Sequence, residues 1–225
     1  MNQKWCLASV TDKTGLPEFA AFLSKRGWKF ISTGGTATCL KGVAGVEVVE
    51  MADWLTKSFV VQTQHADILD PNLSVEDAIK MVASNLGFGE MFGGRVKSLS
   101  REKSAALLSK SLSEDQATFA RLGIEPIDML IVNYYTLNAA TQESNATIYS
   151  VIEKMDIGGP TATLEAIKGD RIVLCQPTDY ATVKINMVAN NADDITPALR
   201  AHLRRTAARL VASYYQPLAD FLESK

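Results

Sequence analysis

Two short loops rich in hydroxyl side chains and glycine are the first segments whose residue types suit anion binding. Thr11, Asp12 and Lys13 follow an apolar run, and residues 32–36 read Ser-Thr-Gly-Gly-Thr. Small residues let backbone N–H groups approach a phosphate, and a following helix adds the positive end of its dipole. Lys13 adds a full positive charge. The pair of loops favours a phosphate site, although either loop alone fits a plain tight turn equally well.

A basic segment further along the chain could bind the same kind of group. Residues 93–98 read Gly-Gly-Arg-Val-Lys-Ser. In an extended segment, Arg95 and Lys97 point to the same side. Two cations on one face, with the Ser98 hydroxyl next in the chain, suit a phosphate or a developing oxyanion. A solvated surface loop is the alternative, and spacing alone does not separate the two interpretations.

Asp156 opens a third segment, Asp-Ile-Gly-Gly-Pro at residues 156–160, in which paired glycines permit close backbone approach. Lys168 lies twelve residues further on. A helix between the two residues could return Lys168 toward the same cleft. A carboxylate and an ammonium group brought together could pass protons if their pKa values are tuned. A structural ion pair is the alternative that the pattern alone favours.

The elements that must position these segments form an α/β pattern. Apolar runs predict strands, and apolar residues at helical spacing predict helices. Strands that alternate with helices are typical of a parallel sheet wrapped by helices, and its strands' carboxyl ends meet at a ligand-binding edge. Strands are expected at residues 5–10, 30–31, 46–49, 127–133 and 171–175, and helices at 16–26, 37–41, 114–122, 147–155 and 160–167. From Pro197 to about Glu223 we expect one long helix, or two joined near Pro217.

Bulk properties exclude several classes of protein. The chain has 225 residues, 47% of them hydrophobic and 21% charged, which suits one globular domain. Its net charge of -2 provides no overall basic field for nucleic acid or an anionic membrane. No segment approaches the roughly 18 apolar residues of a membrane-spanning helix. We therefore expect a cytoplasmic protein with reduced cysteines, no nucleic-acid partner and no membrane partner.

Six segments together resemble the IMP cyclohydrolase domain of the bifunctional enzyme family that also carries AICAR transformylase. They are SVTDKTG at 9–15, STGGT at 32–36, GRVKS at 94–98, GIEPID at 123–128, NYY at 133–135 and DIGGPT at 156–161. The first two are shared with methylglyoxal synthase-like domains, whereas those around Arg95 and Asp156 are more specific. The resemblance runs from about Lys4 to the end of the chain. It implies a methylglyoxal synthase-like, three-layer α/β fold with a mostly parallel sheet.

The resemblance also implies a purine nucleotide site and assigns residues to it. A group at the 5′-phosphate and ribose would be Thr11, Asp12, Lys13, Thr33, Gly34, Gly35 and Thr36. A further binding segment would be Arg95, Val96, Lys97 and Ser98, and residues near the base would be Val132, Asn133, Asp156 and Ile157. The catalytic group would be Lys97, Tyr135, Asp156 and Lys168. The expected partners are the substrate nucleotide, IMP, a second copy of the chain as a homodimer, and a separate AICAR transformylase, since the resemblance covers only the cyclohydrolase domain.

Ring closure to IMP, the final step of purine biosynthesis, suits these residue types. The carboxamide nitrogen of the formylated aminoimidazole carboxamide ribonucleotide attacks the formyl carbon, and water then leaves. A base must remove a proton from this poor nucleophile, and donors aimed at the formyl oxygen stabilise its charge. Lys168 and Asp156 are assigned to proton transfer, and Lys97 and Tyr135 to stabilising the oxyanion; which does which step is open. No cofactor and no metal are expected.

Departures from the family pattern affect the rim of this pocket. Ser98-Leu99-Ser100-Arg101 stands where the family usually has Thr-Leu-His-Pro, Thr136-Leu137 follows the tyrosine in place of Pro-Phe, and Gly169-Asp170 replaces Asn-His. About thirty extra residues, at about 55–85, form an insertion in the single domain of residues 1–225. Its apolar content argues against disorder. It is expected to act as a lid or a subunit contact, with a decorative insertion as the alternative.

Two other functions stay open at this point. A methylglyoxal synthase-like phosphate lyase would share the fold and the two phosphate loops, but its chemistry does not require the Asp156 and Lys168 segments. A non-catalytic nucleotide-binding regulatory domain would keep the nucleotide site without turnover. The altered segment after Lys97 keeps that second alternative in view.

Overall fold

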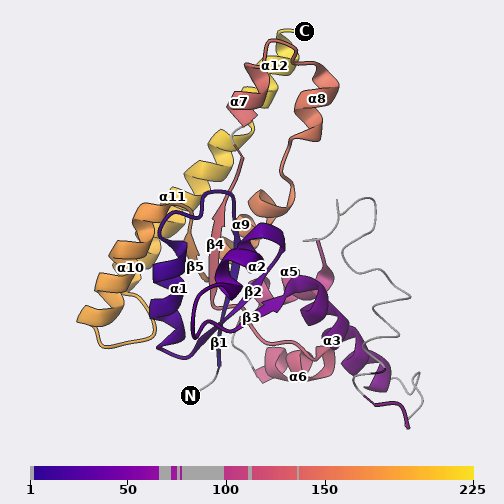
Figure 1. Ribbon diagram of the computed structural model, residues 1–225, viewed down its shortest axis with the longest axis vertical. Helices are drawn as coiled ribbons and strands as arrows, with labels where there is room; N and C mark the ends of the chain where they lie inside the picture. Colours follow the sequence, from indigo (N-terminus) through magenta and orange to yellow (C-terminus); the bar gives the residue numbers. More distant parts are fainter. Residues whose placement is uncertain (1–2, 66–71, 75–76, 78–98, 111–112, 136) are drawn as a thin grey trace.

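A five-stranded parallel sheet forms the centre of the molecule. The computed structural model describes residues 3–65, 72–74, 77, 99–110, 113–135 and 137–225 (Figure 1). The strands lie in the order β3-β2-β1-β4-β5, and every pairing between neighbours is parallel. Their bounds are β1 Lys4–Val10, β2 Trp28–Ser32, β3 Val48–Glu50, β4 Met129–Asn133 and β5 Ile172–Leu174. The α/β class expected from the sequence is confirmed.

The order of the strands creates a switch point between β1 and β4. From β1 the chain moves outward to β2 and β3 on one side, and then returns to build β4 and β5 on the other. In open α/β sheets, the crevice at such a point, beyond the carboxyl ends of the strands, is the usual ligand site. The register places Val10 opposite Asn133, so the last residues of β1 and β4 lie side by side there.

Alternate residues of each strand pack into two apolar cores, one on each face of the sheet. Cys6 and Ala8 of β1 face the first core, together with α1 and α10; Leu7 faces the second, with α3, α5, α6 and α9. Figure 1 shows α1 and α10 on one side of the sheet and α3, α5 and α6 on the other. The bounds are α1 Leu16–Ser24, α2 Gly34–Lys41, α3 Met51–His65, α5 Arg101–Leu108, α6 Ser113–Leu122, α9 Gly158–Lys168 and α10 Pro177–Ala189.

The C-terminal region consists of two helices, α11 Pro197–Tyr214 and α12 Gln216–Glu223. This matches the second of the two arrangements expected from the sequence. Leu203 contributes to the first core and Ala207 to the second, so α11 closes the edge of the sheet beyond β5. Proline at the first turn of each helix has no N–H to leave unpaired.

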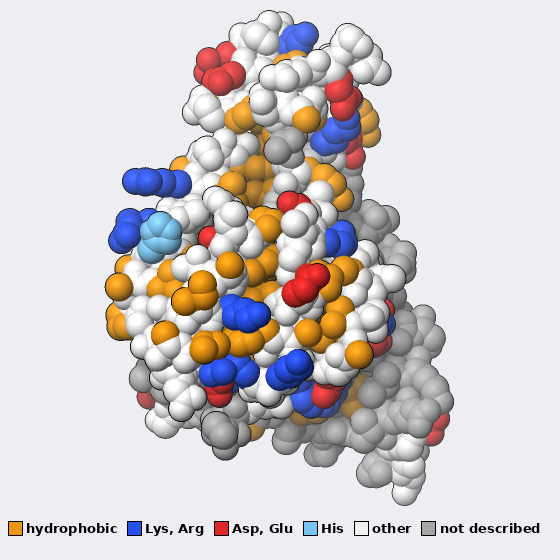
Figure 2. Space-filling view, turned by 60° about the vertical axis from the view of Figure 1, so that its left-hand side comes forward, with side chains coloured by type: hydrophobic (Ala, Val, Ile, Leu, Met, Phe, Trp, Pro, Cys, Tyr) orange, Lys and Arg blue, Asp and Glu red, His pale blue; other side chains and the backbone are white. Residues whose placement is uncertain are grey.

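A lobe projects beyond the carboxyl ends of the strands. It contains α7 Leu137–Thr141, α8 Ile148–Glu153 and α12, and it lies at the opposite end of the molecule from the N-terminus (Figure 1). The space-filling view shows a narrower waist between this lobe and the body of the sheet, with apolar side chains visible in it (Figure 2). The lobe therefore adds a wall to the crevice at the switch point.

The first part of the expected insertion belongs to the folded body. Leu55 and Val60 of α3 are buried, and the Ser58 hydroxyl donates a hydrogen bond to the backbone oxygen of Leu122 at 2.6 Å. A Cβ placed on Gly123, which has φ +62°, would lie 2.5 Å from the Val61 side chain. Most of residues 66–85 lie outside the described part of the chain. The expected extent and role of the insertion therefore stay predictions.

None of the helices in the described ranges combines the length and the hydropathy of a membrane-spanning segment.

Candidate functional site

The loop after β1 and the start of α2 lie next to each other at the carboxyl edge of the sheet. Gly34 and Gly35 are exposed at the N-terminal end of α2, where backbone N–H groups have no partner within the helix. A Cβ placed on Gly35 would lie 3.9 Å from the Lys13 ammonium nitrogen. Lys13 also donates hydrogen bonds to the backbone oxygens of Val10 at 3.4 Å and Thr11 at 3.3 Å. A positive charge thus stands beside free backbone donors, which is a suitable arrangement for a phosphate.

The side chain of Asn133 holds the loop after β1 in place. Its amide oxygen accepts hydrogen bonds from the backbone N–H groups of Thr11 at 2.7 Å and Asp12 at 2.9 Å. Its amide nitrogen donates to the backbone oxygen of Asp12 at 2.9 Å. The Asp12 carboxylate in turn accepts a hydrogen bond from Thr14 N–H at 2.9 Å. Hydrogen bonding from the side chain and the backbone of Thr14 lowers the pKa of Asp12. The loop is therefore fixed before any ligand arrives.

Thr36, expected as a phosphate contact, uses its hydroxyl within the fold. The side chain is 5% exposed; its oxygen accepts a bond from Val10 N–H at 3.1 Å, and the hydroxyl donates to the Val10 backbone oxygen at 3.0 Å. It therefore ties the start of α2 to the end of β1. Thr33 is partly buried and caps α2 with an extended backbone but without a side-chain hydrogen bond.

The Asp156 carboxylate caps the N-terminal end of α9. Its Oδ1 accepts a hydrogen bond from Gly159 N–H at 3.0 Å. A Cβ placed on Gly159 would lie 2.6 Å from Asp156 Oδ2 and 2.7 Å from the Tyr134 ring. Glycine is required at this position because a side chain would clash with both the carboxylate and the ring. The Tyr134 hydroxyl is hydrogen-bonded to Thr163, and burial raises its pKa well above the ordinary value.

Tyr135 and Asp156 line the same cavity, whose volume is about 670 Å³. Its remaining walls come from Ser9 at the end of β1 and from the lobe: Ala139, Ala140, Glu143, Glu153, Lys154 and Met155. The Tyr135 side chain is 65% exposed. A cavity of this size lies within the usual range for small-molecule sites. The cavity stands at the switch point, where the strand order predicts a ligand site.

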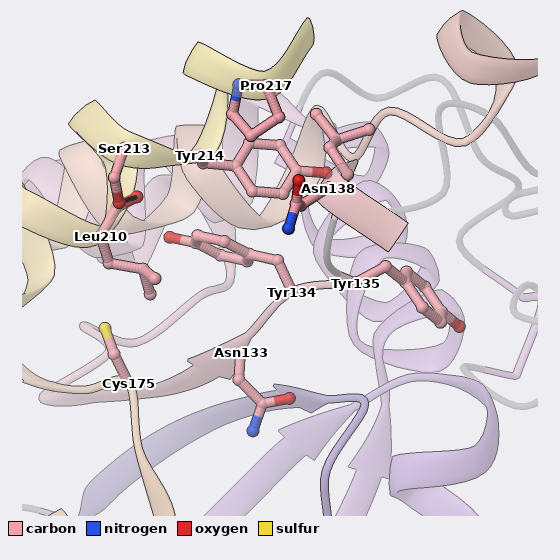
Figure 3. Close-up of a pocket in the computed structure, with 10 residues that line it drawn as sticks. Asn133, Tyr134, Tyr135, Asn138, Cys175, Leu210, Ser213, Tyr214 and Pro217 are labelled. Atoms are coloured by element: carbon pink, nitrogen blue, oxygen red, sulfur yellow. Dashed lines mark hydrogen bonds between the residues drawn. The ribbon is translucent and has the colours of Figure 1, made fainter. Parts of the chain in front are cut away.

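A smaller cavity of about 230 Å³ lies on the other side of the Tyr134–Tyr135 segment. Figure 3 shows Tyr134 directed toward Leu210 and Ser213, whereas Tyr135 turns the opposite way. Cys175 forms part of this second cavity, and burial raises the pKa of its thiol to about 12. The thiol is therefore protonated at neutral pH.

The structure separates Lys168 from Asp156, contrary to the expectation that a helix would return the lysine to the same cleft. Asp156 precedes α9, and Lys168 is the last of its eleven residues. At a rise of about 1.5 Å per residue, the helix carries Lys168 roughly 15 Å away, toward the amino ends of the strands. A straight helix separates its two ends. Return would require a turn between them.

The other expected residues fall into three groups. Val132 is buried in the second core, so only its backbone can face a ligand. Ile157 is exposed next to Asp156. The segment Arg95, Val96, Lys97 and Ser98 lies outside the described residues, so its binding and catalytic roles stay predictions.

Within the described ranges, no group of three or more potential metal-binding side chains comes together.

Sequence reasoning missed residues that contact this site from the C-terminal helices. Tyr214 and Tyr215 approach the Asp156 backbone from α11 and the residue after it. In the sequence, Tyr214 falls on one apolar stripe of the predicted C-terminal helix with Leu203 and Val211, a pattern that predicts core packing and gives no signal of a polar contact. Tyr215 lies outside that stripe and was not singled out. Ser9 was also not singled out, although its alternate position on β1 places it on the same face as Leu7.

No family model matches the chain. The chain is 33% identical over 225 residues, or 99% of its length, to the bifunctional purine biosynthesis protein PurH of Lactiplantibacillus plantarum. It is also 33% identical over 224 residues, or 98% of its length, to the protein of the same name from Neisseria meningitidis. It spans 37% and 36% of these two relatives.

A solved structure supports the fold. The crystal structure of ForH matches with a TM-score of 0.70 at 24% identity, covering 99% of this chain and 100% of that one.

Proposed function

We propose that this chain, which is homologous to PurH over 99% of its length, is an IMP cyclohydrolase. In this reaction the formylated aminoimidazole carboxamide ribonucleotide closes its six-membered ring and loses water. The observation that carries the proposal is the single cavity shared by Tyr135 and Asp156 at the switch point, beyond the pre-formed loop after β1. The chain spans about a third of its relatives' length, so their whole activity does not transfer with the similarity.

The nucleotide's phosphate belongs at the start of α2. Backbone N–H groups of Gly34 and Gly35 and the Lys13 ammonium can bind its oxygens, and the helix dipole adds to their attraction. The ribose would then lie over the loop held by Asn133, and the base would enter the larger cavity. An intramolecular ring closure gains most from holding the reactive rotamer, which a rigid loop at one end of the substrate provides.

Asp156 is the proposed proton acceptor. Its Oδ1 is held by Gly159 N–H. Within the part of the chain that the structure describes, no hydrogen bond uses Oδ2. That oxygen can take the proton from the carboxamide nitrogen as the nitrogen attacks the formyl carbon. The Tyr135 hydroxyl, largely exposed in the cavity wall, is the proposed donor of the first proton to the formyl oxygen. The proton held by Asp156 then completes the leaving water, while the former formamide nitrogen gives up its proton to Tyr135 as the ring double bond forms.

The proposed roles of the two lysines now differ. Lys97 keeps its proposed role in stabilising the oxyanion. Lys168 of the same subunit is not included in proton transfer because α9 holds it far from Asp156. The proposed partners are IMP, a second copy in a homodimer and a separate AICAR transformylase, and the proposed location is the cytoplasm.

The test is a turnover assay in the presence of a strong chelator. Purified protein is incubated with the formylated nucleotide, and IMP formation is followed by purine absorbance. We expect enzymatic turnover under these conditions. A rate no higher than that of buffer, from protein with a cooperative unfolding transition, would contradict the proposal.

A nucleotide-binding regulatory domain is the second candidate, and the distance between Lys168 and Asp156 favours it. It predicts that IMP binds in calorimetry while the formylated nucleotide is not converted. The methylglyoxal synthase-like alternative predicts methylglyoxal release from dihydroxyacetone phosphate instead. The three candidates therefore differ in outcome: IMP formation, IMP binding without conversion, or methylglyoxal release.

A further inference from the structure

Two consecutive tyrosines from the C-terminal helices hold the backbone of Asp156. The Tyr214 hydroxyl accepts a hydrogen bond from Asp156 N–H at 2.8 Å. The Tyr215 hydroxyl donates a longer bond to the Asp156 backbone oxygen at 3.4 Å. The two bonds cross a separation of 58 and 59 residues in the chain. Both polar backbone groups of Asp156 are therefore bonded to one short segment.

The ring of Tyr214 fixes the position of its hydroxyl. The side chain is 7% exposed and packs edge-on against Tyr134, with ring centroids 5.1 Å apart and an interplanar angle of 71°. It also packs edge-on against Tyr215 at 4.9 Å. Figure 3 shows the Tyr214 ring between Tyr134 and Pro217. Because the ring is confined on both sides, its hydroxyl has little freedom to leave the Asp156 N–H.

These contacts hold Asp156 from two sides, at its carboxylate and at its backbone. On the side of α9, Gly159 N–H donates to Oδ1 of Asp156. On the side of α11, the Tyr214 hydroxyl accepts from the backbone N–H of Asp156. Tyr134 links the two sides, because its hydroxyl bonds to Thr163 and its ring packs against Tyr214 and fills the space that a Cβ on Gly159 would need. A reacting carboxylate must be held to within about half an ångström of its productive geometry.

We propose that Tyr214 is a positioning residue that sets the direction of the Asp156 carboxylate through the backbone N–H of Asp156. This inference rests on the proposed cyclohydrolase function, in which Asp156 is the proton acceptor. Tyr214 lines the smaller cavity and is not among the residues that line the larger one, where the base is proposed to lie. Its removal should therefore lower the rate of the chemical step more than it weakens nucleotide binding.

The main test is Tyr214→Phe, which removes the hydroxyl and keeps the packed ring. We expect kcat to fall about tenfold, as for the loss of one well-placed hydrogen bond, while KM changes less than about threefold. Tyr149→Phe is the matched control, because Tyr149 is 74% exposed on α8, and it should leave both constants unchanged. Equal changes in kcat and KM, or none, would overturn the inference.

A double variant distinguishes positioning from a general structural effect. In an Asp156→Asn background, Tyr214→Phe should change the residual kcat less than about twofold, because residues acting through one group are not additive. A further tenfold loss in that background would contradict action through Asp156.

Amide hydrogen exchange tests the contact without turnover. In Tyr214→Phe, the Asp156 amide should exchange at least about tenfold faster than in the wild type, while amides in β1 keep their rates. Unchanged protection at Asp156 would overturn the inference even in an active enzyme. Conversely, an inactive wild type with this change in exchange would contradict only the proposed function.

Discussion

Asn133 and Asp12 exchange two hydrogen bonds across the switch point, each 2.9 Å long. The Asn133 amide oxygen accepts from Asp12 N–H, and its amide nitrogen donates to the Asp12 backbone oxygen. The pair joins the end of β4 to the loop after β1, which is 121 residues earlier in the chain. The resemblance implied that Asn133 lies near the base of the nucleotide; its observed hydrogen bonds hold the loop after β1.

Asn133→Ala should therefore weaken IMP binding. The variant loses three hydrogen bonds to the loop, each worth about 1 kcal/mol, so we expect the Kd for IMP to rise roughly tenfold to a hundredfold. Calorimetry measures the change. Asn138→Ala on α7 is the control, because Asn138 lines the smaller cavity. If the two variants bind IMP with the same Kd, the Asn133 side-chain amide is not needed to hold the loop for IMP binding.

Lys13→Ala should reduce the contribution of the phosphate to binding. A phosphate contact is similar in the ground and transition states, so KM should rise while kcat changes little. The ratio of inosine to IMP affinity isolates the effect, because inosine has no phosphate. We expect IMP binding to weaken about tenfold or more and inosine binding to stay constant. Parallel losses for both ligands would place Lys13 elsewhere in the site.

Asp156→Asn and Lys168→Ala should behave differently. Loss of the proton acceptor should lower kcat by about a hundredfold or more. Lys168→Ala should change kcat less than about threefold, because α9 separates this lysine from Asp156. Steady-state assays of both variants make the comparison. A loss as large for Lys168→Ala would mean that Lys168 acts in a site completed by another subunit, and mixed dimers of the two variants would then regain activity.

Two glycines of the α9 region should respond to alanine in different ways. A Cβ on Gly159 would meet the Asp156 carboxylate and the Tyr134 ring, so Gly159→Ala should mainly lower kcat. A Cβ on Gly169 would lie 1.8 Å from the backbone oxygen of Leu107, so Gly169→Ala should mainly lower the Tm. Overpacking of this kind commonly costs about 1–3 kcal/mol. Activity assays and thermal unfolding of both variants test the prediction. The same ratio of kcat loss to Tm loss in the two variants would refute it.

The sequence predicted the fold largely because apolar runs and turn residues act locally. Residues 5–10 and 127–133 read as buried strands, and these match β1 and β4. The two loops predicted to bind an anion, around residues 11–13 and 32–36, lie at the carboxyl ends of β1 and β2, and their binding role stays a prediction. Helix α10 was not predicted, although Pro177 is a standard first-turn residue. The helical periodicity of α3 was similarly not recognised, because Leu55 and Val60 were assigned to an insertion, whereas both side chains are buried in the folded body.

Site residues were harder to predict wherever their roles depend on contacts between distant segments. Thr36 and Asn133 have the residue types of ligand contacts, but their partners, Val10 and Asp12, are found only in three dimensions. Lys168 was paired with Asp156 from a count of residues, which says nothing of the direction in which a helix carries the chain. Tyr214 lies on an apolar stripe, and its hydroxyl contact has no pattern in the sequence.

A crystal structure with bound IMP tests the central claim most directly. We predict the phosphate within hydrogen-bonding distance of the Gly34 and Gly35 N–H groups and the Lys13 ammonium, with the base between Tyr135 and Asp156 in the larger cavity. IMP bound in the smaller cavity of Figure 3, or with its phosphate away from the start of α2, would contradict the account.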